Sequence, residues 1–117
     1  MNTFSMTTPL TGEYFTTVRL AVGGLCSLAG FDMDSTEDFK VCVTECLLIL
    51  KRNGFEAAKV TLRLGEELAC EIAGEGTFGE KMDTPENEIS LALLSALLGS
   101  VDFVNDDDRV VKIQFKG

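Results

Sequence analysis

Residues 2–30 carry a strand pattern followed by a helix pattern. Residues 2–8 alternate around Phe4 and Met6, which predicts a short strand that ends at Pro9. From residue 11 onward, apolar side chains recur every three or four positions, which predicts an amphipathic helix that stops at Gly30. The apolar face of this helix consists of Phe15, Val18, Val22, Leu25 and Cys26.

A second helix pattern follows with the same spacing. Ser35 or Thr36 can cap its beginning, and Asn53-Gly54 closes it. Its buried stripe consists of Phe39, Cys42, Val43, Cys46, Leu47 and Leu50.

The middle of this second helix is more apolar than one buried stripe requires. Val41, Leu48 and Ile49 add hydrocarbon beyond the stripe, and Glu45 is the main charge that remains. A surface apolar patch of this kind often marks an interaction site, so Val41, Leu48 and Ile49 are candidate partner-binding residues. They could equally complete the core, and Glu45 could be an ordinary solvated or ion-paired surface acid.

The second half of the chain predicts two hairpins separated by a helix. Residues 59–64 and 68–72 alternate as strands, and residues 74–79 form a glycine-rich segment predicted to be a loop. The run Asp83-Thr84-Pro85-Glu86 starts a helix, with a capping residue before the proline, and Gly99 ends it. The apolar residues of this helix lie nearly all round it, which predicts that it is well covered. Residues 101–104 and 109–115 form the last strands, around an acidic turn.

This order predicts an α/β (α+β) two-layer sandwich. Hairpins interrupted by helices favour a mixed, mostly antiparallel sheet with helices on one face, in the order β-α-α-β-β-α-β-β. No internal repeat or linker divides the sequence, so residues 1–117 are expected to form a single domain.

Composition and charge narrow the function classes. The chain is 45% hydrophobic and 25% charged, which is typical of a folded globular protein. Its net charge of −9 gives no basic footprint for nucleic acid or anionic membranes, and would favour a basic protein partner. The acidity could also serve solubility alone. With no histidine, acid–base chemistry would rest on carboxylates, lysines or cysteines.

The sequence predicts a cytoplasmic protein. No apolar run approaches the ~20 residues that cross a bilayer, and residues 1–8 lack the features of a signal peptide. In that compartment the four cysteines are expected to be free thiols that pack as small hydrophobes, rather than a metal or redox site. They are Cys26, Cys42, Cys46 and Cys70.

Two helices carry a family resemblance. Residues 15–20 and the run 35–46, which contains the sequence Thr44-Glu45-Cys46, resemble the small serine-kinase anti-sigma factors. That family belongs to the histidine-kinase-like (GHKL) ATPase superfamily. The resemblance implies the histidine-kinase-like ATPase fold and a role in partner switching. Such proteins sequester a sigma factor and phosphorylate a serine of its antagonist with Mg-ATP.

The family's nucleotide-binding residues are only partly matched. Glu45 corresponds to the glutamate that acts as general base or orders the metal-bound water. Ile49 stands where the family has the asparagine that binds Mg²⁺, and a hydrocarbon offers no oxygen ligand. Gly74 replaces the aspartate that binds adenine, so only Gly76 of that motif is kept.

The phosphate-binding motif before the last helix is also altered. Residues 86–91 contain no glycine, and Asp83, Glu86 and Glu88 would repel phosphate at the helix N-terminus. The lid region at residues 79–84 is very short. These departures predict a dismantled nucleotide site and no expected cofactor.

Three functions remain open from the sequence. The first is a non-catalytic protein-binding module whose partner is a sigma factor or an anti-sigma factor antagonist. The second is a divergent serine kinase that uses Mg-ATP, with Glu45 as base. The third is a structural element of an assembly, such as a homodimer. The fold alone does not choose among them.

Overall fold

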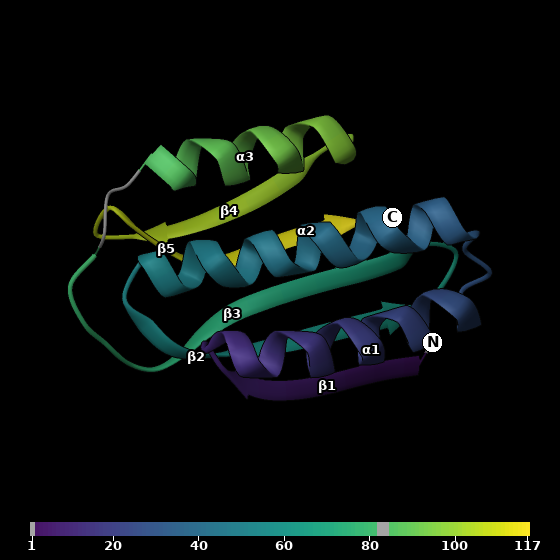
Figure 1. The fold of residues 1–117 in the computed structure, drawn as a ribbon, viewed down its shortest axis with the longest axis horizontal. Helices are drawn as coiled ribbons and strands as arrows, with labels where there is room; N and C mark the ends of the chain where they lie inside the picture. Colours follow the sequence, from purple (N-terminus) through teal and green to yellow (C-terminus); the bar gives the residue numbers. More distant parts are fainter. Residues whose placement is uncertain (1, 82–84) are drawn as a thin grey trace.

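A computed structural model describes residues 2–81 and 85–117. The order of elements agrees with the sequence prediction (Figure 1). The elements are β1 (Asn2–Pro9), α1 (Gly12–Leu28), α2 (Met33–Arg52), β2 (Phe55–Leu64), β3 (Leu68–Phe78), α3 (Pro85–Leu97), β4 (Val101–Asp106) and β5 (Arg109–Lys116).

The strands form one sheet in the order β1-β2-β3-β5-β4, with the three helices on one of its faces (Figure 1). The predicted two-layer α+β architecture is therefore confirmed. Each of the four strand pairings is antiparallel, whereas a mixed, mostly antiparallel sheet was predicted. Short turns make the β2–β3 and β4–β5 pairings antiparallel. The β1–β2 and β3–β5 pairings are made across connections that contain helices.

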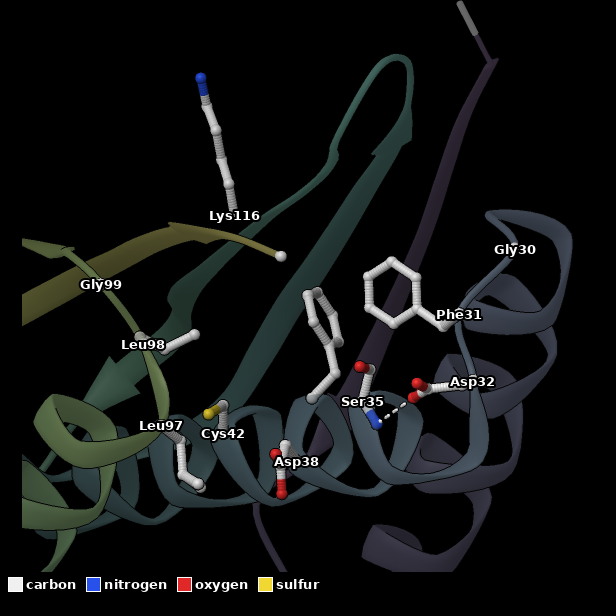
Figure 2. A pocket seen from close by; sticks show the side chains of 12 residues that line it. Gly30, Phe31, Asp32, Ser35, Asp38, Cys42, Leu97, Leu98, Gly99 and Lys116 are labelled. Carbon is white, nitrogen blue, oxygen red and sulfur yellow. Dashed lines mark hydrogen bonds between the residues drawn. The ribbon is translucent and has the colours of Figure 1, made fainter.

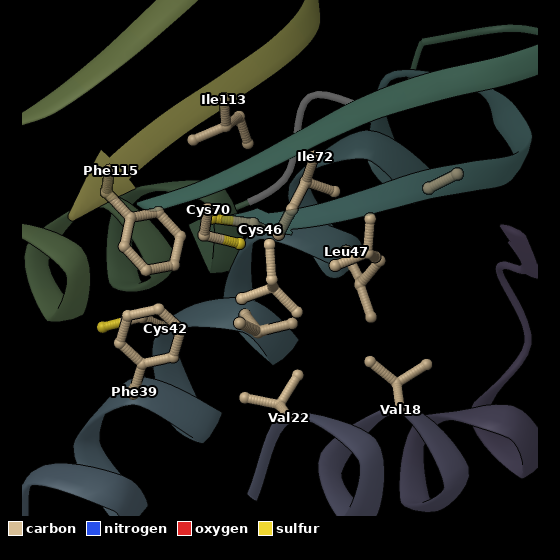
Figure 3. Packing of buried hydrophobic residues seen from close by; sticks show 14 of the residues in the cluster. Val18, Val22, Phe39, Cys42, Cys46, Leu47, Cys70, Ile72, Ile113 and Phe115 are labelled. Atoms are coloured by element: carbon tan, nitrogen blue, oxygen red, sulfur yellow. The ribbon is translucent and has the colours of Figure 1, made fainter. Parts of the chain in front are cut away.

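The core lies between the helices and the sheet. Val18 and Val22 of α1 face Leu47 of α2, and Ile72 and Ile113 close the core from the strands (Figure 3). All four cysteines are free and buried, as predicted. Burial raises the pKa of the Cys42 thiol to about 11 and also raises the pKa of the Cys46 and Cys70 thiols, so all three stay protonated at neutral pH.

Helix α2 begins earlier than predicted. Asp32 is its N-cap, and the Asp32 carboxylate accepts a hydrogen bond of 2.8 Å from the backbone N–H of Ser35. Ser35 is therefore the residue whose amide is capped, not the cap itself, and Thr36 is likewise inside the helix. The predicted helix stops are confirmed, because Gly30 and Gly54 follow α1 and α2 with φ angles of +83° and +94°.

The glycine-rich segment is a strand, not the predicted loop. Residues 74–78 extend β3 and pair with the beginning of β2, with Gly74 opposite Ala58. A Cβ at Gly74 would lie 2.5 Å from the Phe55 ring, so the aromatic side chain requires glycine there. Gly76 has a φ of +81° beside the register shift of this pairing. Strand packing, rather than phosphate binding, explains these glycines.

Helix α3 is more exposed than predicted. Only Ser90 and Leu94 are buried, whereas the structure leaves several large apolar side chains in contact with solvent. The exposed ones are Ile89, Leu91, Leu93 and Leu97. The helix packs on α2 through one narrow stripe. Apolar residues on every side of α3 therefore do not mean that every side is buried by other elements. The expected capping residues at positions 83 and 84 lie outside the described residues.

Candidate functional site

Helix α2 presents the candidate base and its neighbours to helix α3. Glu45, Ile49 and Arg52 are spaced by four and three residues, so they lie on one side of α2. Helix α3 packs against α2. The family resemblance assigns this side of α2 to the nucleotide pocket, and α3 covers part of it.

Polar side chains join the two helices. Ser90 of α3 donates a hydrogen bond of 2.9 Å from its hydroxyl to Oε2 of Glu45. Arg52 Nη1 donates to Ser90 Oγ at 2.8 Å and to Asn87 Oδ1 at 3.3 Å. Ser90 is only 1% exposed, so its hydroxyl links the carboxylate and the guanidinium away from solvent. We call Glu45, Arg52, Asn87 and Ser90 the α2–α3 polar cluster.

The apolar candidates on α2 do not share one environment. Ile49 is only 3% exposed, Leu48 is half-buried against the core, and Val41 is exposed. Ile49 also stands one helical turn after Glu45, where the resemblance expects a magnesium ligand. Its side chain can supply packing at this position but no metal-binding oxygen.

Asn53 connects the end of α2 to strand β5. Its side-chain amide donates to the Ile49 carbonyl at 2.8 Å, and its Oδ1 accepts from the Val110 backbone N–H at 3.0 Å. Arg109 Nη1 donates to the carbonyl oxygens of Asn53 and Gly79. Sequence reasoning gave Asn53 only the role of ending a helix. In the structure Asn53 is buried, and its side-chain hydrogen bonds connect the end of α2 to β5, which no local sequence pattern reveals.

A cavity of about 510 Å³ lies beside the polar cluster. Ile49 and Leu91 supply apolar lining, while Asn87, Glu88 and Lys81 supply polar groups. Lys81 is engaged, since its Nζ donates to the Asp108 carbonyl at 2.6 Å. Across the described part of the chain, no three Asp, Glu, Cys or His side chains are grouped to hold a metal ion.

The remaining sequence candidate lies apart from this cavity. Gly76 is on β3 and is not among the residues that line it. A Cβ at Gly76 would lie 2.9 Å from a carboxylate oxygen of Glu56. The structure therefore brings Glu45 and Ile49 together with Ser90 and Arg52, and leaves Gly76 elsewhere. Ser90 was not identified from the sequence. The feature that could have indicated it is a polar residue at the centre of the apolar stripe of a helix.

Comparison with known proteins adds a relative that spans most of the chain. No protein-family model matches the sequence. The serine-protein kinase RsbW of Bacillus mycoides (strain KBAB4) is 23% identical over 127 residues, which cover 91% of this chain and 79% of the relative. The chain is distantly similar to RsbW. RsbW of Bacillus cereus (strain ATCC 10987 / NRS 248) is 21% identical over the same shares.

The similarity to RsbW agrees with the resemblance carried by residues 15–20 and 35–46. It covers 91% of the chain, which is more than these two helices. At this level of identity, each site residue has to be judged by its own contacts, because function resides in the site rather than in the fold. Among the described residues, no helix combines the length and hydropathy that a membrane span requires.

Proposed function

We propose that this chain is a non-catalytic relative of the RsbW serine-protein kinases that binds a protein partner and has no working Mg-ATP site. The partner class is a sigma factor or an anti-sigma factor antagonist. The observation that carries the proposal is the Ser90–Glu45 hydrogen bond of 2.9 Å beside the buried Ile49.

The engaged carboxylate argues against Glu45 as a catalytic base. A general base must reach the hydroxyl whose proton it takes, or a water between them. Glu45 instead accepts a hydrogen bond from Ser90, whose hydroxyl also accepts one from Arg52. Phosphoryl transfer further depends on a metal ion to neutralise charge. Ile49 supplies no ligand for that ion.

The surroundings of the expected adenine and phosphate positions support the same proposal. Gly74 packs against the Phe55 ring within the sheet, and no acceptor for an adenine amino group stands at that position. Glu86 and Glu88 occupy the first turn of α3. Carboxylates there interact favourably with the helix dipole but repel a phosphate that would bind the same amides.

The second candidate function is a divergent serine-protein kinase. The cavity of about 510 Å³ favours it, because its lining includes Asn87 of the α2–α3 polar cluster and Ile49, which stands one turn of α2 after the candidate base. In that case Glu45 would act on a serine hydroxyl, and the Ser90 hydrogen bond would have to open first.

A binding and phosphotransfer assay separates the two functions. The full chain is incubated with sigma factors and antagonists of Bacillus mycoides, and with radiolabelled Mg-ATP. We expect binding without nucleotide and no labelled antagonist, while RsbW of the same organism serves as the active control. Labelling that disappears in Glu45→Gln would contradict the non-catalytic proposal. Binding to neither class of protein would contradict the proposed partners.

A further inference from the structure

Helices α2 and α3 leave several large apolar side chains in solvent. Ile89, Leu93 and Leu97 are spaced by four residues, so they lie on one side of α3, and they are 60%, 36% and 37% exposed. Val41 of α2 is 39% exposed. Leu97 lines a cavity together with Asp38 and Cys42, so it lies beside the turn of α2 that carries Val41. We call Val41, Ile89, Leu93 and Leu97 the α2–α3 outer face.

Acids outnumber bases on the two helices that carry this surface. Helix α3 has Glu86 and Glu88 in its first turn and no lysine or arginine. Helix α2 carries four acids and three bases, and one of the bases, Arg52, is hydrogen-bonded to Ser90 and Asn87. On α2, Glu37 and Asp38 stand one turn before Val41, and the nearby Lys40 is paired with Glu37 at 3.3 Å. An apolar stripe bordered by acids is complementary to an apolar stripe bordered by bases.

A cavity lies at the end of the outer face. It has a volume of about 570 Å³, and Phe39 forms part of its apolar lining. Cys42 and Leu97 line it as well (Figure 2). Asp32 and Asp38 supply two carboxylates in the same cavity and Lys116 supplies one ammonium group, so carboxylates outnumber the cation. Lysine and arginine combine a hydrocarbon stem with a charged end, so a basic side chain matches both features of this lining.

We propose that the α2–α3 outer face binds an amphipathic helix of a protein partner, in which lysine or arginine borders a leucine or isoleucine stripe. A basic side chain of that helix enters the cavity lined by Phe39 and Asp38. This inference rests on the proposed function, because it names the surface through which the chain binds protein. A second copy of the chain fits poorly, since pairing would bring two acidic surfaces together. Anionic lipid is disfavoured for the same reason.

A peptide titration tests this surface. The probe is a labelled amphipathic helical peptide of leucine and lysine, added to the full chain and followed by fluorescence anisotropy. One comparison peptide replaces lysine with glutamate, and another keeps the composition but scrambles the leucine stripe. We expect the lysine peptide to bind at least about tenfold more tightly than either comparison peptide.

Matched variants locate the binding. Leu93→Gln should weaken the lysine peptide by about tenfold, whereas Leu20→Gln, at a 70% exposed site on α1, should leave binding unchanged. Both positions are solvent-exposed on helices, and circular dichroism verifies that both variants fold. Equal losses in the two variants, equal binding of the glutamate peptide, or no binding at all would overturn the inference. So would a dimer, measured by light scattering, that Leu93→Gln dissociates.

The peptide titration contains no nucleotide, so its result is independent of the phosphotransfer assay that tests the proposed function. Absence of peptide binding removes this surface as the docking site. It leaves the Mg-ATP site to be decided by the phosphotransfer assay with Glu45→Gln.

Discussion

Ser90 joins helix α3 to two charged side chains of helix α2. Its hydroxyl donates to Glu45 and accepts from Arg52, and both partners lie on α2. Hydrogen bonds to charged groups contribute more to stability than hydrogen bonds between neutral groups. A buried charged group that loses its partner also adds a desolvation cost. A single hydroxyl therefore holds two charged side chains of α2 in place.

Replacement of Ser90 by alanine should destabilise the protein. We expect Ser90→Ala to lower the free energy of unfolding by about 1–3 kcal/mol, because Glu45 and Arg52 lose their shared partner. Urea unfolding followed by circular dichroism measures this change. Ser95→Ala, at an exposed position on the same helix, is the matched control and should change stability little. Equal effects of the two substitutions would contradict the role of the polar cluster.

Long-range contacts separate the site residues whose roles could be predicted from the sequence from those whose roles could not. Glu45 and Ile49 could be singled out because their neighbours along α2 form a recognisable motif. Ser90, Asn53 and Arg52 could not, because their roles come from contacts with residues at least 35 positions away or from burial in the folded chain. Sequence spacing reports neighbours on one helix, and it does not report what a second helix brings to them.

At the scale of elements, the beginning of α2 depends on a titratable cap. The hydrogen bond from Ser35 lowers the pKa of the Asp32 carboxyl from its ordinary value of 3.8. Because the folded-state pKa is the lower one, the unfolded chain binds more protons in acid. The stabilisation from this cap is present above pH 3.8 and is lost as the pH falls through the folded-state pKa.

The variant Asp32→Asn tests this titration. Asparagine caps a helix nearly as well as aspartate but carries no titratable group. We therefore expect the loss of stability on acidification below pH 3.8 to be smaller in Asp32→Asn than in the wild type, as measured by thermal unfolding across pH. Asp32→Ala should be less stable than either at neutral pH. An acid dependence that is unchanged in Asp32→Asn would contradict the assignment of the cap.

Strand β3 depends on the absence of a side chain at position 74. Gly74→Ala should lower the free energy of unfolding by about 1–3 kcal/mol, because its Cβ would lie 2.5 Å from the buried Phe55 ring. Gly24→Ala is the control, since a Cβ there meets nothing within 4 Å. In the interior of α1 that change should stabilise by about 0.5–1 kcal/mol. Chemical denaturation of both variants measures the contrast, and a stable Gly74→Ala would refute the packing explanation.

The sequence predicted elements well where one periodicity dominated. The apolar spacing of α1 and α2 placed most of their buried residues, and alternation placed the core of β2 and β3. The sequence prediction was wrong where the same residue composition is compatible with two different structures. The glycines at positions 74 and 76 suggested a loop but lie in a strand, and the leucines of α3 suggested full burial but lie partly in solvent. In each case the deciding contact comes from another element.

At the scale of the whole molecule, the fold and the candidate site lead to different expectations about function. The chain has the predicted α+β architecture and a distant similarity to RsbW over 91% of its length. Its candidate site instead combines a hydrogen-bonded Glu45, a buried Ile49 and acids at the beginning of α3. This combination is the basis of the proposal that the chain binds a protein rather than catalyses phosphotransfer, because function resides in the site and not in the fold.

The most direct test of the central claim is calorimetric titration of the full chain with ATP and ADP, with and without Mg²⁺. RsbW of Bacillus mycoides is the positive control. We predict no binding heat at millimolar nucleotide under either condition, and none for Ile49→Asn, because the adenine and phosphate contacts are altered as well. Magnesium-dependent binding of ATP by the wild-type chain, or micromolar affinity in Ile49→Asn, would contradict the account.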